Sequence, residues 1–301
     1  MLYSKYAIFL KVIEFGSMSK AAMYCNYSQS AVSQIISSME KELQLTLLNR
    51  SSSGIRLTPA GEHMLPYIKS LQQAEDTVFD QSAKLRGIEF GHIRIGTFSS
   101  VSCHILIPIL KEFKREYPNI SIEVREGDNL TIESWLTGGS VDFGFIDAPT
   151  MQGFESISVC RDPFVAVMAA DSKYAASGTV PLEIFEKAPM ALFDEGTKKE
   201  AVGILYKNKI KPKIEYTSRD DNVILSLIEH NLCLGFMGKL ILTRTQYKVV
   251  SRRTTPQFYR DIIFTVKDRT VASAFAQRFI EFIERYINSA NSFPTETQST
   301  Y

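Results

Sequence analysis

The stretch FGSMSKAAMYCNYSQSAVSQII, residues 15–36, predicts two short helices that pack across a tight turn. Ala21 and Ala22 are small enough to let the helices approach closely, and Asn26 tolerates the left-handed backbone of such a turn. Ser28 is placed as the N-cap of the second helix, because its hydroxyl can accept a hydrogen bond from a first-turn amide. Apolar residues recur with helical spacing and would hold that helix to its domain: Val32, Ile35 and Met39.

The opposite face of the second helix, expected over residues 28–39, is polar and suits the major groove of DNA. A helix N-terminus can face a phosphate, and glutamine side chains can pair with adenine. The candidate DNA contacts are therefore the polar residues of this face: Ser28, Gln29, Ser30, Ser33, Gln34 and Ser37. Taken alone, the same pattern also fits an ordinary Ser-rich helical hairpin, so the flanking sequence decides between the two.

A small β-hairpin, or wing, is predicted after this helix. In TLLNRSSSGIRLTPAG, residues 46–61, two short apolar runs flank a turn rich in Ser and Gly. Each side of the turn carries one arginine, Arg50 or Arg56. We expect Ser33 and Arg50 to bind phosphate, and Arg56 to reach the DNA backbone or the minor groove.

These motifs together resemble the N-terminal signature of LysR-type transcriptional regulators. The resemblance is carried by AA at 21–22, SQSAVS at 28–33, ME at 39–40, LLNR at 47–50 and RLTPAG at 56–61. The chain departs from the family at Ser30, where proline is usual, and at Leu48 and Met18, where phenylalanine is common. The resemblance implies binding to double-stranded DNA at an interrupted palindromic operator as a dimer or tetramer, and contact with RNA polymerase if the protein activates transcription.

A long linker helix is predicted from Pro59, because proline suits the first turn of a helix. The linker is expected over 59–90, with a hinge at Gly87 and Gly91. Its helix carries residues spaced alternately by four and three: Met64, Ile68, Leu71, Glu75, Val78, Ser82 and Leu85. Such a heptad seam favours pairing with a second copy, as the resemblance also implies. Because Glu75 and Ser82 interrupt the seam, packing on its own domain is the alternative.

Strands alternate with helices from residue 91 onward, which predicts parallel α/β units. The expected fold class is α/β: an N-terminal all-α winged helix-turn-helix with a long linker helix, then a two-lobed Rossmann-like effector domain. The segment GHIRIG at 91–96 extends the resemblance, which implies a type II periplasmic-binding-protein-like domain. We expect the second lobe to begin near Phe164 with a strand at 165–169. A strand at 262–266 and the final helix are expected to return the chain to the first lobe.

The expected boundaries follow from these elements. They are 1–58 for the DNA-binding domain, 59–90 for the linker helix and hinge, 91–287 for the effector domain and 288–301 for a disordered tail. Within the effector domain, lobe I is expected at about 91–162 and 267–287, and lobe II at about 163–266.

Ligands of open α/β sheets bind beyond the carboxyl ends of the strands. In the two lobes this rule selects the candidate effector contacts: Thr97, Phe98, Ser99, Ser100, Ser102, Asp128, Asn129, Asp147, Asp194, Thr197, Arg219 and Phe236. The hydroxyl-rich loop at 97–102 leads into a helix, so it can present hydroxyls and amides to an anion, or its hydroxyls can simply cap the helix.

The charge of the small-molecule effector, expected to be a metabolite, stays open at this point. Four carboxylates in the predicted site would repel a dianion: Asp128, Asp147, Asp194 and Glu195. Arg219 or Lys198 would have to face them to reverse that repulsion.

Charge is distributed unevenly along the chain, whose net charge is +1. Residues 1–60 contain six Lys and Arg against three Glu, a net charge of +3, which leaves −2 for the remainder. No run approaches the ~20 apolar residues of a membrane span, so we expect a cytoplasmic protein with no membrane partner. Its four cysteines and four histidines are scattered, which argues against disulfides, a metal site or a cofactor. Cys103 beside His104 is more simply a structural residue than a redox sensor or metal ligand.

The sequence contains no GxSxG motif, phosphate loop or metal-ligand pair, so we do not expect an enzyme. The favoured hypothesis is a DNA-binding transcriptional regulator whose activity depends on an effector held between two lobes. One alternative is a small-molecule-binding protein that acts through protein partners and uses its N-terminal domain to oligomerise. The other is an enzyme fused to a helix-turn-helix.

Overall fold

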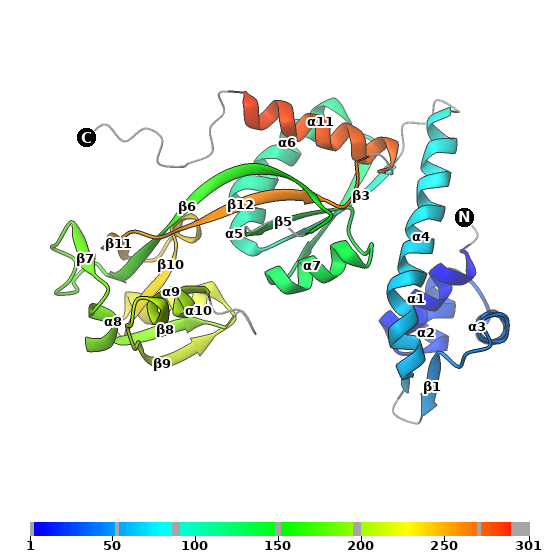
Figure 1. The fold of residues 1–301 in the computed structure, drawn as a ribbon, viewed down its shortest axis with the longest axis horizontal. Coiled ribbons are helices and arrows are strands. Elements are labelled where there is room, and N and C mark those ends of the chain that lie inside the picture. Colours follow the sequence, from blue (N-terminus) through cyan, green and yellow to red (C-terminus); the bar gives the residue numbers. More distant parts are fainter. Residues whose placement is uncertain are drawn as a thin grey trace.

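A computed structural model describes residues 3–51, 54–85, 91–147, 152–194, 200–269 and 272–289. In Figure 1 an N-terminal helical domain and one long helix lie beside a two-lobed α/β part whose lobes share two long strands. Several expectations lie outside the described residues. They are the hinge at Gly87, the effector contact Thr197, the opposing charges Glu195 and Lys198, and nearly all of the expected disordered tail.

The N-terminal domain is the predicted winged helix-turn-helix. Its elements are α1 (Lys5–Phe15), α2 (Met18–Cys25), α3 (Gln29–Leu43), β1 (Leu48–Ser51) and β2 (Gly54–Leu57). Asn26 between α2 and α3 has the expected left-handed backbone, with φ 57°, and the Ser28 hydroxyl accepts from the amide of Ala31 as an N-cap. Ala21 and Ala22 are buried where the helices meet. These local predictions are confirmed.

The apolar face of α3 differs from the prediction by one residue. Val32, Ile36 and Met39 are buried, whereas Ile35 only packs against the edge of the core. The helix also continues to Leu43, one turn beyond the predicted end. Because α1 covers α3 as well as α2, the buried stripe is centred on Ile36 rather than Ile35.

The wing is fixed to α3 by a carboxylate. Oε1 of Glu40 accepts hydrogen bonds from the amides of Leu47 at 2.7 Å and Leu48 at 3.0 Å, which orients the start of β1. On the other strand the amide of Ile55 donates to the carbonyl oxygen of Gly16 at the end of α1. Both strands of the wing are therefore held to the helices.

The linker helix α4 (Pro59–Leu85) corrects the predicted heptad seam. Ile68 is only 1% exposed and Met64 packs beside it, because this side of the helix covers the core of the N-terminal domain. The exposed apolar stripe keeps two of the predicted seam positions, Leu71 and Val78, and adds Tyr67 and Ala74; we call these four residues the α4 stripe. The first two seam positions therefore face inward, and the apolar residues that stay exposed to solvent are those of the α4 stripe.

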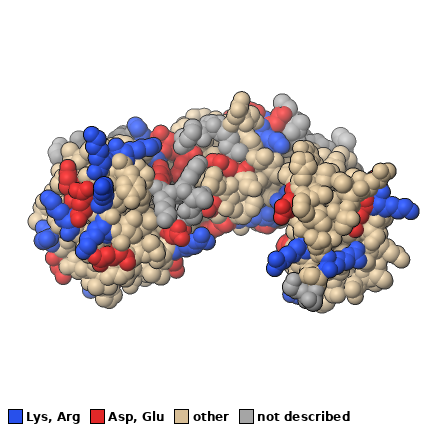
Figure 2. Space-filling model, turned by 60° about the horizontal axis from the view of Figure 1, so that its bottom comes forward, with Lys and Arg blue, Asp and Glu red and all other residues tan. Residues whose placement is uncertain are grey.

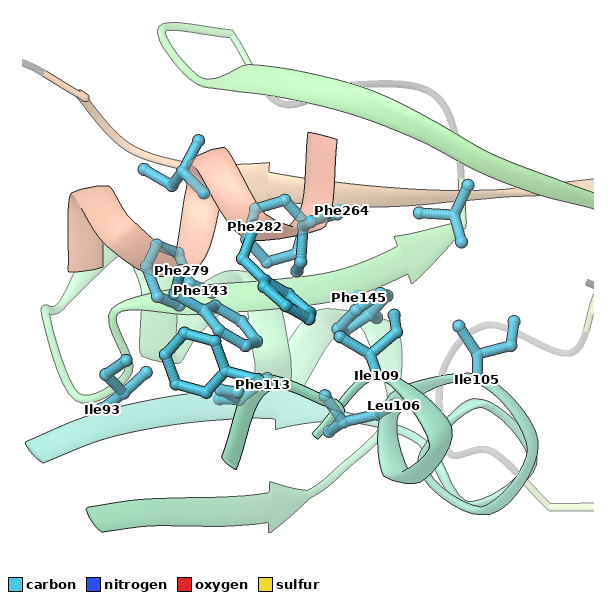
Figure 3. Close-up of a cluster of buried hydrophobic side chains, with 14 of the residues drawn as sticks. Ile93, Ile105, Leu106, Ile109, Phe113, Phe143, Phe145, Phe264, Phe279 and Phe282 are labelled. Carbon is cyan, nitrogen blue, oxygen red and sulfur yellow. The ribbon is translucent and has the colours of Figure 1, made fainter. Parts of the chain in front are cut away.

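Lobe I is built on the strands β3 (Gly91–Thr97), β4 (Ile120–Glu126), β5 (Phe143–Asp147) and β12 (Tyr259–Val266) with the first half of β6 (Glu155–Ala169). Its strand order is β4-β3-β5-β12-β6. The helical elements are α5 (Ser99–Val101), a π-helix (Ser102–Leu106), α6 (Ile107–Glu116), α7 (Asn129–Thr137) and α11 (Ala274–Asn288). Between the sheet, α6 and α11 lies an aromatic core in which Phe113 contacts Phe279 at 4.9 Å between ring centroids (Figure 3).

Lobe II contains the second half of β6 with β7 (Thr179–Pro181), β8 (Pro189–Phe193), β9 (Lys213–Ser218), β10 (Leu234–Gly238) and β11 (Val249–Thr255). Its helical elements are α8 (Ile184–Lys187), α9 (Glu200–Lys207), α10 (Asp221–Glu229) and a 3₁₀ helix (Lys239–Leu242). The order β6-β10-β8-β9 places its parallel strands β10, β8 and β9 side by side.

The crossing between the lobes corrects two expectations. Strand β6 begins at Glu155, well before the predicted strand at 165–169, and pairs with β12 in lobe I before it pairs with β10 in lobe II. Strand β12 pairs with β5, so it belongs to lobe I and the expected end of lobe II at residue 266 is too late. The predicted return at 262–266 is confirmed. One crossing lies within a continuous strand, and the other lies between two strands that follow closely in the chain. The alternation of strands and helices in the sequence marks neither crossing.

Candidate functional site

The polar face of α3 is open to solvent. Gln29, Ser30, Gln34 and Ser37 are exposed, whereas Ser33 is half-buried. The hydroxyls of Ser28 and Ser30 lie 2.9 Å apart, so the position that departs from the family pattern joins the N-cap of the helix. The predicted candidates therefore form one continuous surface at the N-terminal half of α3.

Arg50 connects the wing to this surface. Its Nη1 donates to Oγ of Ser33 at 3.1 Å, and its Nη2 donates to Oγ of Ser37 at 3.5 Å. The guanidinium thus lies along α3 while remaining exposed. Arg56 is exposed on the neighbouring strand, in register with Asn49. Both predicted arginines therefore lie on the wing, one of them in contact with α3, and side chains of this type commonly bind phosphates.

Charged residues of the N-terminal domain leave a broad uncharged area between them. In Figure 2 this domain, on the right, shows Lys and Arg along its edges around a largely tan surface. Lys5 and Lys11 pair with Glu42 at 2.5 Å and Glu14 at 2.7 Å, so they add little to the positive field.

A cavity of about 330 Å³ lies between the lobes. Nine of the predicted effector contacts line it: Phe98, Ser99, Ser100, Asp128, Asn129, Asp147, Asp194, Arg219 and Phe236. Ligands were expected at the carboxyl ends of the strands, and the residues identified in this way do lie together in the fold.

Two predicted contacts lie behind the cavity wall. Thr97 is fully buried and its hydroxyl donates to the carbonyl oxygen of Phe98, because the last residue of β3 points into lobe I. Ser102 is buried in the π-helix, where its Oγ has no hydrogen-bond partner among the described residues. Neither side chain lines the cavity.

Arg260 is the main cavity residue that the sequence did not indicate. It stands at the start of β12, which runs antiparallel to β5, so the first residues of β12 lie at the same sheet edge as Asp147. A search limited to the carboxyl ends of strands misses a residue that lies at the beginning of an antiparallel strand. Its Nη2 lies 2.8 Å from Oδ2 of Asp162 and donates to Oγ of Ser100 at 3.1 Å, and its guanidinium covers the ring of Phe98.

The pair Arg260 and Asp162 connects the lobes. Both side chains are almost completely buried, and Oδ1 of Asp162 also accepts from the amide of Leu240 in lobe II at 2.9 Å. Burial lowers the pKa of Arg260, but the carboxylates of Asp162 and Asp147 raise it by more, so the guanidinium stays charged. The pair therefore links the loop at Ser100 in lobe I to the first residues after β10.

Two further carboxylates have unusual surroundings. Oδ2 of Asp147 accepts from the Asn129 side chain at 2.6 Å, and the Asp147 amide donates back to Oδ1 of Asn129. The second oxygen of Asp147, Oδ1, is buried with no partner in the described part of the chain. Asp221, the first residue of α10, has its pKa raised to about 6, chiefly by burial, with Arg260 lowering it and Asp220 raising it.

The residue types that bind metal ions do not cluster within the described ranges. No group of three His, Cys, Asp or Glu side chains there is arranged to hold a metal ion. Burial raises the pKa of Cys160 to about 12 and that of Cys233 to about 11, which keeps both as thiols. Among the described helices, none combines the length and the apolar composition that crossing a membrane requires.

Comparisons with known proteins agree with this architecture. A family model described as "Bacterial regulatory helix-turn-helix protein, lysR family" matches residues 4–62, and one described as "LysR substrate binding domain" matches residues 86–287. A Bacillus subtilis protein named "Uncharacterized HTH-type transcriptional regulator YvbU" is 29% identical over 93% of this chain and 97% of its own.

Solved structures share the whole fold. Full-length OxyR from Pseudomonas aeruginosa superposes with a TM-score of 0.74 at 17% identity, covering 99% of this chain and 98% of that chain. CbnR, described as a LysR family transcriptional regulator, superposes with a TM-score of 0.67 at 19% identity, over 93% of this chain and 97% of its own. With both domains matched by the family's models, the chain belongs to the LysR family of transcriptional regulators, as a DNA-binding domain joined to a substrate-binding domain.

Proposed function

We propose that this regulator reads its operator with the polar face of α3, and that a small molecule in the cavity between the lobes controls that reading. The observation that carries the proposal is the exposed surface of Gln29 and Gln34 with Arg50 laid alongside it. Glutamine can form bidentate hydrogen bonds with adenine, each worth about 1–3 kcal/mol of discrimination. The free amides at the start of α3 and the two wing arginines would take neighbouring phosphates.

Two copies would act together on double-stranded DNA. The α4 stripe presents apolar side chains to solvent, with Val78 67% exposed, and nothing in the described part of the same chain covers it. Its spacing is that of a helix that pairs with another helix. A dimer with two α3 helices fits an interrupted palindrome, because the symmetry of the protein then matches that of the operator.

The cavity supports the control step. Its wall is divided between the lobes, and β6 with β12 joins the lobes, so a ligand that touches both walls favours one lobe arrangement over others. A related fold supports such occupancy: the Synechocystis CcmR regulatory domain, at a TM-score of 0.61 and 12% identity, was solved in complex with 2-PG.

Charged contacts connect lobe I to the linker helix α4. Nη2 of Arg94 in β3 pairs with Oδ1 of Asp142 at 2.9 Å, and its Nη1 lies 3.9 Å from Oδ2 of Asp76 in α4. A shift of lobe I would therefore act on the helix that positions the DNA-binding domain.

The proposal is tested by letting the full-length protein select its own sites from random double-stranded DNA. We then expect Gln29→Ala to lose about tenfold or more in affinity for the selected site and to relax the preference at one base pair per half-site. Gln246→Ala, the same exchange at an exposed position in lobe II, should bind like the wild type. Equal affinity and equal base preference in the two variants would reject the role of Gln29. Selection of no sequence at all would instead favour a protein that acts through protein partners.

A further inference from the structure

The charges of the cavity wall are unbalanced. Among the described residues six carboxylates line it, from Glu126, Asp128, Asp147, Asp194, Glu200 and Asp221, against the two guanidiniums of Arg219 and Arg260. In Figure 2 acidic side chains gather over the middle of the molecule, between lobe II and the N-terminal domain. Among the charged side chains that the structure describes at the cavity, an anionic ligand would have only those two arginines to pair with.

Both arginines already have carboxylate partners. Arg260 is paired at 2.8 Å with the buried Asp162, which lies just behind the wall, and Asp147 adds a second negative charge near it. Arg219 is largely exposed, and its Nε lies 3.7 Å from Oδ2 of Asp194. A ligand carboxylate at either arginine would have to compete with an aspartate that is part of the fold.

Two carboxylates, in contrast, have hydrogen-bonding capacity to spare. Oδ1 of Asp147 is buried at the cavity without a partner in the described part of the chain, although its other oxygen is held by Asn129. Asp221, on the opposite lobe, forms no hydrogen bond through its side chain to any other described residue. A buried acceptor without a donor, such as Oδ1 of Asp147, is costly, and a donor supplied by a ligand would remove that cost.

Aromatic rings form the remaining wall independently of these acids. Phe164 and Phe236, 5.2 Å apart between centroids, line the cavity from lobe II with Phe193 and Leu192. Ring faces attract cations and exclude water, so the wall combines cation–π partners with carboxylates. This is the recognition chemistry of a protonated nitrogen attached to an apolar body.

We infer that the effector is an amine: a small molecule with a protonated nitrogen placed between Asp147 and Asp221 and an apolar body against the phenylalanine wall of lobe II. The inference rests on the proposed role of the cavity as the effector site. It also supplies a closing force, because one cation would be shared by a carboxylate from each lobe.

The test uses full-length protein and matched probes that differ only in charge. One set is 2-phenylethylamine, 2-phenylethanol and 3-phenylpropanoate, and the other is hexylamine, hexanol and heptanoate. We expect an amine in at least one set to bind about tenfold or more tightly than its carboxylate counterpart, as measured by thermal shift and calorimetry. Asp147→Asn should weaken that amine by a similar factor, whereas the exposed Asp171→Asn should not change its binding.

Three outcomes would overturn the inference. They are tighter binding of the carboxylates than of the amines, no detectable binding of either amine, and an amine that binds Asp147→Asn as well as it binds the wild type. The effect of each probe on binding to the selected DNA is measured separately. A carboxylate that binds and changes DNA affinity would leave the proposed function standing and reject only the amine. A bound amine that leaves DNA affinity unchanged would reject the proposed control step instead.

Discussion

Arg260 of β12 and Asp162 of β6 form an ion pair, 2.8 Å between Nη2 and Oδ2, at the place where the chain passes from one lobe to the other. Their side chains are only 6% and 5% exposed. Through Ser100 on one side and the Leu240 amide on the other, the pair ties the cavity loop of lobe I to lobe II. The stability of the crossing between the lobes and the shape of the cavity therefore depend on the same two residues.

Removing one member of this pair should be costly. Arg260→Met leaves the Asp162 carboxylate buried and unpaired, and we expect the free energy of unfolding to fall by about 3–5 kcal/mol in urea titrations. The neighbouring pair of Arg161 and Asp261 joins the same strands at 3.3 Å but is exposed. Arg161→Met should accordingly cost less than about 1 kcal/mol. Similar losses in the two variants would show that burial of the first pair does not matter.

Asp221 should make stability depend on pH in the acid range. Its pKa in the folded protein, about 6, exceeds the ordinary value of 3.8 for an aspartate, so the folded state holds this proton more tightly than the unfolded state does. Stability is therefore lost as pH rises from about 4 to about 6 and is constant above that range. Asp221→Asn should lack this loss and be more stable than the wild type at pH 7.5 by no more than about 3 kcal/mol. A parallel pair of stability curves for the two proteins would refute the raised pKa.

Arg56 should contribute a phosphate contact in each protomer. We expect Arg56→Ala to weaken binding to every DNA sequence alike and to reduce the slope of log affinity against log salt by about 0.9 per protomer. Arg115, exposed on α6 and paired with Glu112, provides the comparison. An Arg115→Ala protein should keep the wild-type slope. If Arg56→Ala kept it too, the wing would not touch the DNA backbone.

The α4 stripe should hold two copies together. Val78→Glu places a charge on the most exposed apolar side chain at the C-terminal end of the α4 stripe, and sedimentation should then detect monomer at concentrations where the wild type is oligomeric. Val223, on α10, is likewise exposed, so Val223→Glu is the matched exchange outside the stripe. It should leave the oligomer intact, and an oligomer that survives Val78→Glu would place the interface elsewhere.

Local sequence signals predicted the N-terminal domain well because they act over a few residues. Asn26, Ser28 and the wing arginines lie where turn, cap and strand preferences put them. The inward face of α4 was mispredicted because its burial depends on another part of the fold and not on the local sequence. Ile68 has heptad spacing, but the fold of the preceding domain decides that it is buried.

The residues of the cavity were predicted only in part, because some of them are brought to it by the fold and not marked by a local signal. The carboxyl ends of β3, β5 and β10 each follow a recognisable apolar run, so Ser99, Asp147 and Phe236 could be found. Arg260 could not, because it lies at the beginning of its strand and not after its end, and only the antiparallel pairing of β12 with β5 brings it to the same edge. Asp162 lies inside β6, a strand whose first half was not anticipated.

Contact between the exposed face of α3 and the bases can be detected by a photoactivatable crosslinking residue in place of Gln34. With the protein bound to DNA that it has itself selected, we expect crosslinks to bases of the half-site from this position, and none when the crosslinker replaces the exposed Gln246. Crosslinks to protein alone from position 34, or equal DNA yields from both positions, would show that this face of α3 does not meet the bases.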